Sequence, residues 1–175
     1  MKATLVAAVL LALLATGCTQ QPAPSPTVTE QNVAGDIPDN QVFVPYTPAD
    51  HGFTVNVPEG WARATDGTAV VFTDKLNSVR IESVASAQAP TVQSRAHFPH
   101  GTVSTAHRTG GDAVLVTYEQ KSTPDPVTGK TIVESVERYE FWRNGVEVVL
   151  SLSGPKGADN VDPWRTVTES FAWRP

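Results

Sequence analysis

The dipeptide Asn144-Gly145 constrains the fold more than any other short segment of this 175-residue chain. Both residues tolerate the positive φ angles of a type I′ turn, which joins the two strands of a tight hairpin. With this pair as the loop, three cross-strand pairs follow: Arg143 with Val146, Phe141 with Val148, and Tyr139 with Leu150. The apolar pairs predict one core face. The opposite face is amphipathic, and we expect a helix to cover it. This face carries Arg138, Glu140, Trp142, Glu147, Val149 and Ser151.

Further strand signals recur along the region from residue 41 onward. In Phe53 to Val57, apolar and polar residues alternate with the period of two that is typical of a half-buried strand. Four more segments have strand composition: Ala69 to Phe72, Val79 to Val84, Ala113 to Glu119, and Thr131 to Trp142. Turns rich in Pro and Gly separate them, for example at residues 58–60 and 124–129. The sequence therefore predicts a mainly antiparallel sheet.

Two helices are expected beside this sheet. Near the C-terminus, Asp162 is placed to cap a helix and Pro163 suits its first position. An apolar stripe follows at helical spacing: Trp164, Val167 and Phe171. A weaker helical signal covers Thr91 to Phe98. Helices on an antiparallel sheet predict an α+β fold, arranged as an αβα sandwich.

Three short motifs resemble the PsbP-like superfamily across about Tyr46 to Trp173. They are Gly52-Phe53-Thr54-Val55-Asn56-Val57-Pro58-Glu59-Gly60-Trp61, Val71-Phe72-Thr73-Asp74 and Glu169-Ser170-Phe171. The stretch from Gly157 to Trp164 also resembles a recurring element of bacterial lipoproteins of this kind. The resemblance implies a flanked antiparallel sheet and a non-enzymatic binding or accessory role. None of the photosystem protein's functional residues is matched, so a photosynthetic function is not implied.

The N-terminus has the pattern of an export signal. Lys2 precedes an uncharged apolar run from Ala3 to Ala15, which is too short to span a bilayer permanently. Thr16-Gly17 and then Cys18 follow, and this looks like a bacterial lipobox, although Ala15 stands where Leu is usual. We expect residues 1–17 to be removed and Cys18 to carry lipid. The alternative is a secreted protein with a chance cysteine.

Cys18 is the only cysteine, so the exported chain has no internal disulfide. Residues 18–40 are rich in Pro, Thr and Gln and predict an extended linker. Residues 41–175 have the length of a single domain. The expected location is therefore the extracytoplasmic side of the cell membrane, where two or more acyl chains give stable anchoring.

Charge excludes one class of partner. The formal net charge is -5, and it becomes -6 once Lys2 is removed with the signal peptide. No cluster of basic residues is present to neutralise phosphates, which argues against nucleic-acid binding. We expect a monomer without a bound cofactor.

The sequence carries no recognisable catalytic pattern. It lacks a Gly-x-Ser-x-Gly motif, a phosphate-binding Gly-rich loop, a His-Glu-x-x-His pair and a second cysteine. Three histidines lie close together in sequence, His97, His100 and His107, and they would bind zinc or copper only if the intervening loop folded back. We therefore expect no enzyme and no metal site.

Tryptophans offer a second candidate site. Trp164 belongs to the helix stripe and Trp61 follows a strand end, so burial is expected for the first and a structural role for both. Trp142 and Trp173 are the candidates for stacking on a sugar or an apolar ligand at the surface.

Two functional hypotheses follow from these observations. The favoured one is a lipid-anchored accessory module that binds an envelope or extracellular protein through the amphipathic sheet face. The alternative is a carrier that holds a lipid or carbohydrate in a cavity between sheet and helix, and a retained ligand would distinguish the two.

Overall fold

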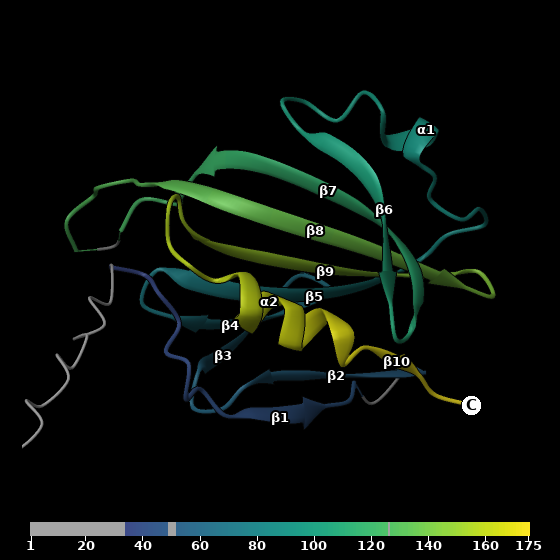
Figure 1. Ribbon diagram of the computed structural model, residues 1–175, viewed down its shortest axis with the longest axis horizontal. Coiled ribbons are helices and arrows are strands. Elements are labelled where there is room, and N and C mark those ends of the chain that lie inside the picture. The colour runs from purple at the N-terminus through teal and green to yellow at the C-terminus, as the bar shows by residue number, and fades with distance from the viewer. Residues whose placement is uncertain (1–33, 49–51, 126) are drawn as a thin grey trace, which may run out of the picture. The chain divides into compact units, whose positions relative to one another are not determined.

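The computed structural model describes residues 34–48, 52–125 and 127–175, all of which belong to one compact unit (Figure 1). These residues form two antiparallel sheets and two helices. The larger sheet has the order β3 (Ala62–Asp66), β4 (Ala69–Asp74), β5 (Asn77–Ala85), β9 (Val146–Pro155), β8 (Val133–Arg143), β7 (Gly111–Lys121), β6 (Thr102–Arg108). The smaller sheet has the order β1 (Phe43–Tyr46), β2 (Phe53–Pro58), β10 (Ala172–Trp173). The helices are α1 (Val92–Arg95) and α2 (Val161–Glu169).

The hairpin centred on Asn144-Gly145 is confirmed. Both residues have positive φ angles, 50° and 84°, and they join β8 to β9. The register has the three expected pairs, Arg143 with Val146, Phe141 with Val148, and Tyr139 with Leu150. Local turn chemistry therefore fixes the pairing of the two central strands of the large sheet.

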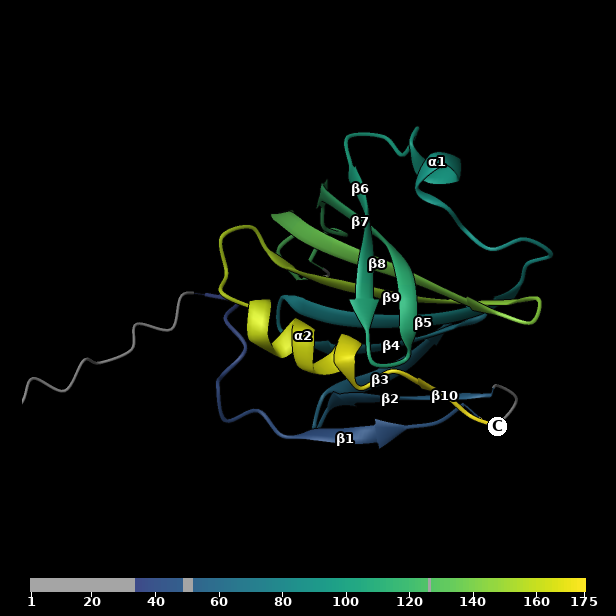
Figure 2. The same ribbon diagram turned by 45° about the vertical axis from the view of Figure 1, so that its right-hand side comes forward.

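The main core lies between one face of the large sheet and a second layer made of α2 and the small sheet. Figures 1 and 2 both place α2 and the strands β1, β2 and β10 on the same side of the large sheet. Phe171, which follows α2, stacks on Phe141 of β8 with ring centroids 4.0 Å apart, and both side chains are fully buried. Phe53 of β2 lies 5.6 Å from Phe171. This aromatic stack joins the layers and fills the space between the end of α2 and the large sheet.

The position of α2 differs from the prediction in two ways. The helix packs on the apolar face that contains Tyr139 and Phe141, and not on the amphipathic face. Asn160 occupies the N-cap position, while Asp162 lies inside the first turn. The physical reason is that Trp164 and Val167 belong to the main core, so the apolar stripe of the helix needs the apolar side of the sheet.

The fold class is α+β and dominated by antiparallel strands, as expected. The finer arrangement is different, because the layer that contains α2 is completed by a small sheet, and the one helix that the described residues place on the other face is the four-residue α1. Thr91 caps α1, within the segment where the weaker helix was expected. Four short strands were not predicted: β1, β3, β6 and β10.

The folded domain begins before the expected boundary at residue 41. Residues 35–37 are held against the start of α2 and the start of β5, an arrangement that we call the N-terminal clamp. Asn160 accepts a hydrogen bond from the Ile37 amide (2.8 Å), and both Asn160 and Asn77 donate to the Gly35 carbonyl (3.2 and 2.9 Å). The Asp159 amide donates to the Asp36 carboxylate (2.9 Å). Ile37 is itself part of the buried core.

Candidate functional site

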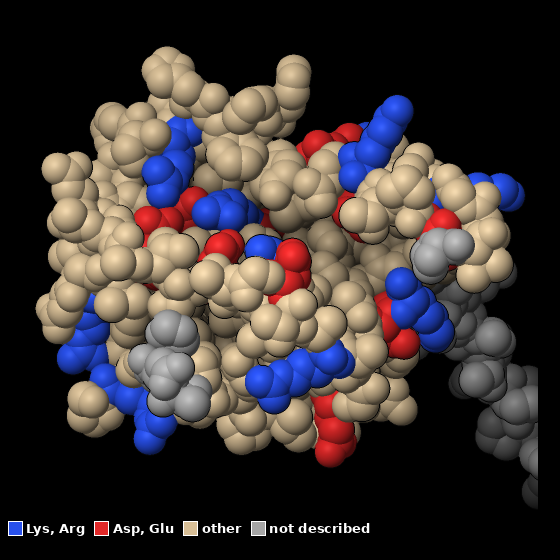
Figure 3. Space-filling view, turned by 180° about the vertical axis from the view of Figure 1, so that it is seen from behind, with Lys and Arg blue, Asp and Glu red and all other residues tan. Residues whose placement is uncertain are grey.

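The face of the large sheet opposite α2, which we call the back face, has its own floor of buried side chains. Val114 and Val116 of β7, Val136 of β8 and Val149 of β9 are at most 7% exposed, and they lie outside the main core cluster. They alternate along their strands with the residues that face α2. Figure 3 shows this side of the molecule, with charged side chains of both signs beside a hollow.

A cluster of two carboxylates and two guanidinium groups crosses the floor at one end. Glu140 is only 1% exposed, and its two oxygens accept hydrogen bonds from Nε of Arg95 and Nε of Arg138, each at 2.7 Å. Nη2 of Arg95 also donates to Glu147, at 3.0 Å. We call these four residues the Glu140 cluster. The charges balance, so the buried carboxylates are compensated where they lie.

The ionisation of Arg95 reflects this environment. Burial alone lowers the pKa of a guanidinium group, because it disfavours the charged form. At Arg95 the hydrogen bonds and charges of Glu140 and Glu147 outweigh that effect together, and the pKa is raised above its ordinary value. Arg95 is therefore a permanent cation that connects α1 to the sheet.

The segment around α1 is attached to the back face at two further points. Nε1 of Trp142 donates to the carbonyl of Ser86 at 2.8 Å, before the helix. Phe98, after the helix, contacts Tyr118 of β7 with ring centroids 4.9 Å apart. The segment of residues 86–98 is therefore attached to the back face through β7 and β8, and the end of these two strands away from Trp142 leads into the β7–β8 loop.

That other end holds a pocket of about 620 Å³ beneath the loop that joins β7 to β8. Its sheet wall carries Arg80, Gln120, Glu134 and Ser153, and its rim carries Lys75 and Lys130 with Asp125. Asp125 orders the loop, since its carboxylate accepts hydrogen bonds from the backbone and hydroxyl of Thr128 and from the amide of Val127. These bonds, the Thr128 amide first, lower the pKa of Asp125 below its ordinary value.

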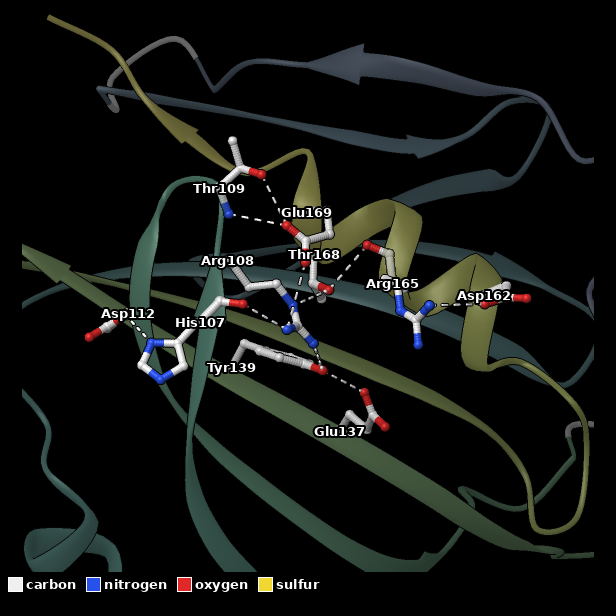
Figure 4. Close-up of polar contacts among 10 residues, drawn as sticks. All are labelled: His107, Arg108, Thr109, Asp112, Glu137, Tyr139, Asp162, Arg165, Thr168 and Glu169. Atoms are coloured by element: carbon white, nitrogen blue, oxygen red, sulfur yellow. Dashed lines mark hydrogen bonds and ion pairs between the residues drawn. The ribbon is translucent and has the colours of Figure 1, made fainter.

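A second polar cluster, shown in Figure 4, joins α2 to the sheet on the opposite face. Arg108 donates from Nη2 to the Tyr139 hydroxyl at 2.8 Å and from Nε to the Thr168 hydroxyl at 3.0 Å. The Tyr139 hydroxyl donates in turn to Glu137 at 2.8 Å. Burial first, and then the hydrogen bond to Glu137, raise the pKa of Tyr139 to about 12. The partners of Arg108 come from within the fold, and the cluster serves to hold the helix.

The two tryptophan candidates are half-buried. Trp142 donates its indole N–H to Ser86, and Trp173 packs edge-on against Phe171 with ring centroids 5.1 Å apart. Ligand binding at Trp142 and Trp173 stays a prediction. Trp164 is buried as expected.

The remaining candidates are the lipidated cysteine and the histidines. Cys18 lies outside the described residues. His107 contacts Asp112 through Nδ1 at 2.6 Å on β6 and β7, while His97 and His100 lie between α1 and β6. Across the described ranges, no three His, Cys, Asp or Glu side chains are arranged to hold a metal ion. None of the helices formed by these residues has the length and apolar composition needed to cross a bilayer.

Sequence reasoning identified part of the back face and missed the rest. The alternation of Arg138, Glu140 and Glu147 indicated an amphipathic face, and these residues belong to the Glu140 cluster. Arg95 was missed, because it is 45 residues from Glu140 in sequence and only the fold brings them together. The pocket beneath the β7–β8 loop carries no motif that would have indicated it.

Comparisons with known proteins give similarity in fold only. No family model and no curated protein matches this sequence. A crystal structure of a protein from Bacteroides thetaiotaomicron is similar with a TM-score of 0.50 at 13% sequence identity, over 71% of this chain. This chain spans 46% of that protein, less than half of its length. LpqN, involved in cell envelope biogenesis of Mycobacterium tuberculosis, matches 78% of this chain and 93% of its own at 15% identity, with a TM-score of 0.42.

Proposed function

We propose that this protein is a lipid-anchored, extracytoplasmic accessory module that binds an envelope or extracellular protein through its back face. The anchor is the lipidated Cys18, and the resemblance to PsbP-like bacterial lipoproteins supports a role without catalysis. The observation that carries the proposal is the composition of the back face, which combines a compensated charge cluster with an open, mixed-charge pocket.

The charges of the back face favour a polar protein surface as the partner. Arg80 and Arg138 keep 33% and 27% of their side chains exposed, and acidic groups lie beside both. A surface with alternating signs selects a partner by complementary charge and fixes its register, while contributing less to raw affinity. The exposed rim around a buried floor also matches the usual anatomy of a protein interface.

The alternative, a carrier with its ligand between sheet and helix, has less support. The space between α2 and the large sheet is filled by Phe141, Phe171 and Val167, each at most 1% exposed. A ligand there would have to displace a close-packed stack, which costs several kcal/mol for side chains of this size. The proposal therefore places the partner on the outside of the sheet.

The test uses the full lipidated protein in membranes. A photo-reactive amino acid is placed at Gln120, which is exposed on the wall of the back-face pocket, and in a matched control at Thr166, which is exposed on α2. We expect a crosslinked adduct of one defined mass from position 120 only, and we expect Arg80→Glu to abolish it. Equal adducts from both positions, or an adduct unaffected by Arg80→Glu, would contradict the proposal.

Anchoring is tested separately by metabolic labelling with radioactive palmitate. The wild-type protein should incorporate label and fractionate with membranes, and Cys18→Ala should do neither. A labelled, membrane-bound Cys18→Ala protein would overturn the assignment of the anchor.

A further inference from the structure

A second pocket lies between the two sheets, away from the back face. It has a volume of about 500 Å³ and opens between the ends of β1 and β2 in the small sheet and strands β3 to β5 in the large sheet. Its volume falls within the range of ordinary small-molecule sites. It is distinct from the space between α2 and the sheet, which is filled.

The interior of this interlayer pocket is largely uncharged and combines apolar with hydroxyl-bearing side chains. Val70, Ile81 and Phe53 line it from the two sheets, and Tyr46 forms the side nearest β3 and β4. Phe53 and Ile81 belong to the main core, so the pocket extends to the edge of that core. The hydroxyl-bearing side chains of the lining, including Ser83, supply polar groups without charge.

Arg63 is the only charged side chain among the described residues that line this pocket. It lies on β3 directly opposite Phe72, and its guanidinium carbon is 5.0 Å from the centroid of the Tyr46 ring and 6.0 Å from that of Phe72. Tyr46 and Phe72 themselves meet edge to face at 5.3 Å. The two rings thus hold the cation at the pocket by cation–π contact.

Arg63 differs from Arg108, which lies on the same face of the large sheet. Arg108 has hydrogen bonds and a carboxylate nearby, whereas the interactions of Arg63 within the described part of the chain are with the two aromatic rings alone. Its N–H donors are therefore available in a fixed fork, which suits a carboxylate or a phosphate.

From this arrangement we infer that the interlayer pocket binds an amphipathic anion, with its acidic group on Arg63 and its apolar chain against Val70 and Ile81. The back-face pocket has no such preference, because its lining includes Asp66, Asp125 and Glu134 together with cations. The cation of Arg63 and the apolar side chains of Val70 and Ile81 thus point to the same ligand class. This site is independent of the protein partner proposed above.

Octanoate is a suitable probe, and neutral 1-octanol has the same chain length. Titration of the ¹⁵N-labelled protein, followed by two-dimensional NMR, should give saturable shifts at the amides of Tyr46, Val70 and Ile81 with octanoate. With 1-octanol the affinity should be at least tenfold weaker, because the pairing with Arg63 is lost. Arg63→Gln should weaken octanoate binding by at least the same factor.

Two further variants keep the test decisive. Arg143→Gln removes an arginine that has no carboxylate partner among the described residues and does not line this pocket, and this variant should bind octanoate as the wild type does. Val70→Phe narrows the pocket while leaving Arg63 in place, and should also weaken binding. The inference is overturned if octanoate gives no saturable shifts, if the shifts map elsewhere, or if Arg63→Gln binds as tightly as Arg143→Gln. The NMR spectrum of each variant reports folding directly.

Discussion

Removal of the Glu140 carboxylate is the sharpest test of how the back face is built. In Glu140→Ala, Arg95 and Arg138 each lose a hydrogen bond of 2.7 Å to a carboxylate that is 99% buried. A hydrogen bond to a charged group contributes about 1.5–3 kcal/mol. The side chains of Arg95 and Arg138 are 31% and 27% exposed, so water can replace part of each lost hydrogen bond. We therefore use the low end of this range for each of the two bonds. We expect a loss of about 3 kcal/mol in the free energy of unfolding.

The assay is urea unfolding at neutral pH, with two companion variants. Glu119→Ala removes a carboxylate whose ion pair with Lys156 is more than half exposed, and should cost less than about 1 kcal/mol. A double-mutant cycle with Arg95→Ala should give a coupling of about 1–3 kcal/mol, since the two residues are in direct contact.

The result that refutes this reasoning is a Glu140→Ala protein within about 0.5 kcal/mol of wild type, or one no less stable than Glu119→Ala. Either would mean that the cost of desolvating Glu140 offsets the bonds that it accepts. Hydrogen exchange adds a local readout, because the amides of residues 92–98 should lose protection in Glu140→Ala before the rest of the domain.

Three further predictions concern the core, the N-terminal clamp and pH. Phe171→Ala removes the central ring of the interlayer stack and should cost about 3–5 kcal/mol in urea unfolding, and a loss below 1 kcal/mol would contradict the packing. Gly154→Ala places a Cβ 2.5 Å from the Asn77 amide oxygen and 2.7 Å from the Asn160 amide nitrogen, so amide exchange at Ile37 should accelerate, which unchanged exchange would disprove. Since the pKa of Tyr139 is raised to about 12, the unfolded chain loses this proton near pH 10 while the folded protein keeps it, and stability should fall as pH rises from 10 toward 12. Burial also raises the pKa of Tyr118, so ultraviolet titration of the wild type should show two late tyrosines. Tyr139→Phe should remove the transition near pH 12, and a transition that persists there in this variant would refute the assignment.

Local chemistry predicted the centre of the fold well. The turn at Asn144-Gly145 and the alternation on either side of it fix both the register and the face of each residue. The edge strands of the sheets were harder to predict, and β3 of the large sheet shows why. Its five residues are all exposed, so no apolar alternation was present in the sequence to indicate a strand.

The candidate sites depend on contacts between distant parts of the chain. The amphipathic alternation in β8 and β9 indicated that a helix would cover it, but the sequence did not tell which helix belongs to which face. Trp164 and Val167 of α2 pack on the apolar face of the sheet. The one-turn α1 lies on the back face, where Arg95 pairs with Glu140. No sequence pattern indicated Arg63 as a site residue, because its neighbours Tyr46 and Phe72 come from other strands.

The N-terminal clamp also determines how the domain would respond to mechanical load. Under the proposed anchoring, sixteen residues separate the lipidated Cys18 from Gly35, and a fully extended chain of that length reaches roughly 50 Å. A pull from a bound partner would enter the fold at residues 35–37, where four hydrogen bonds involving Asn77, Asn160 and the Asp36–Asp159 pair resist it. The side chain of Asn160 therefore resists this load, because its hydrogen bonds join residues 35–37 to Asn77 at the start of β5.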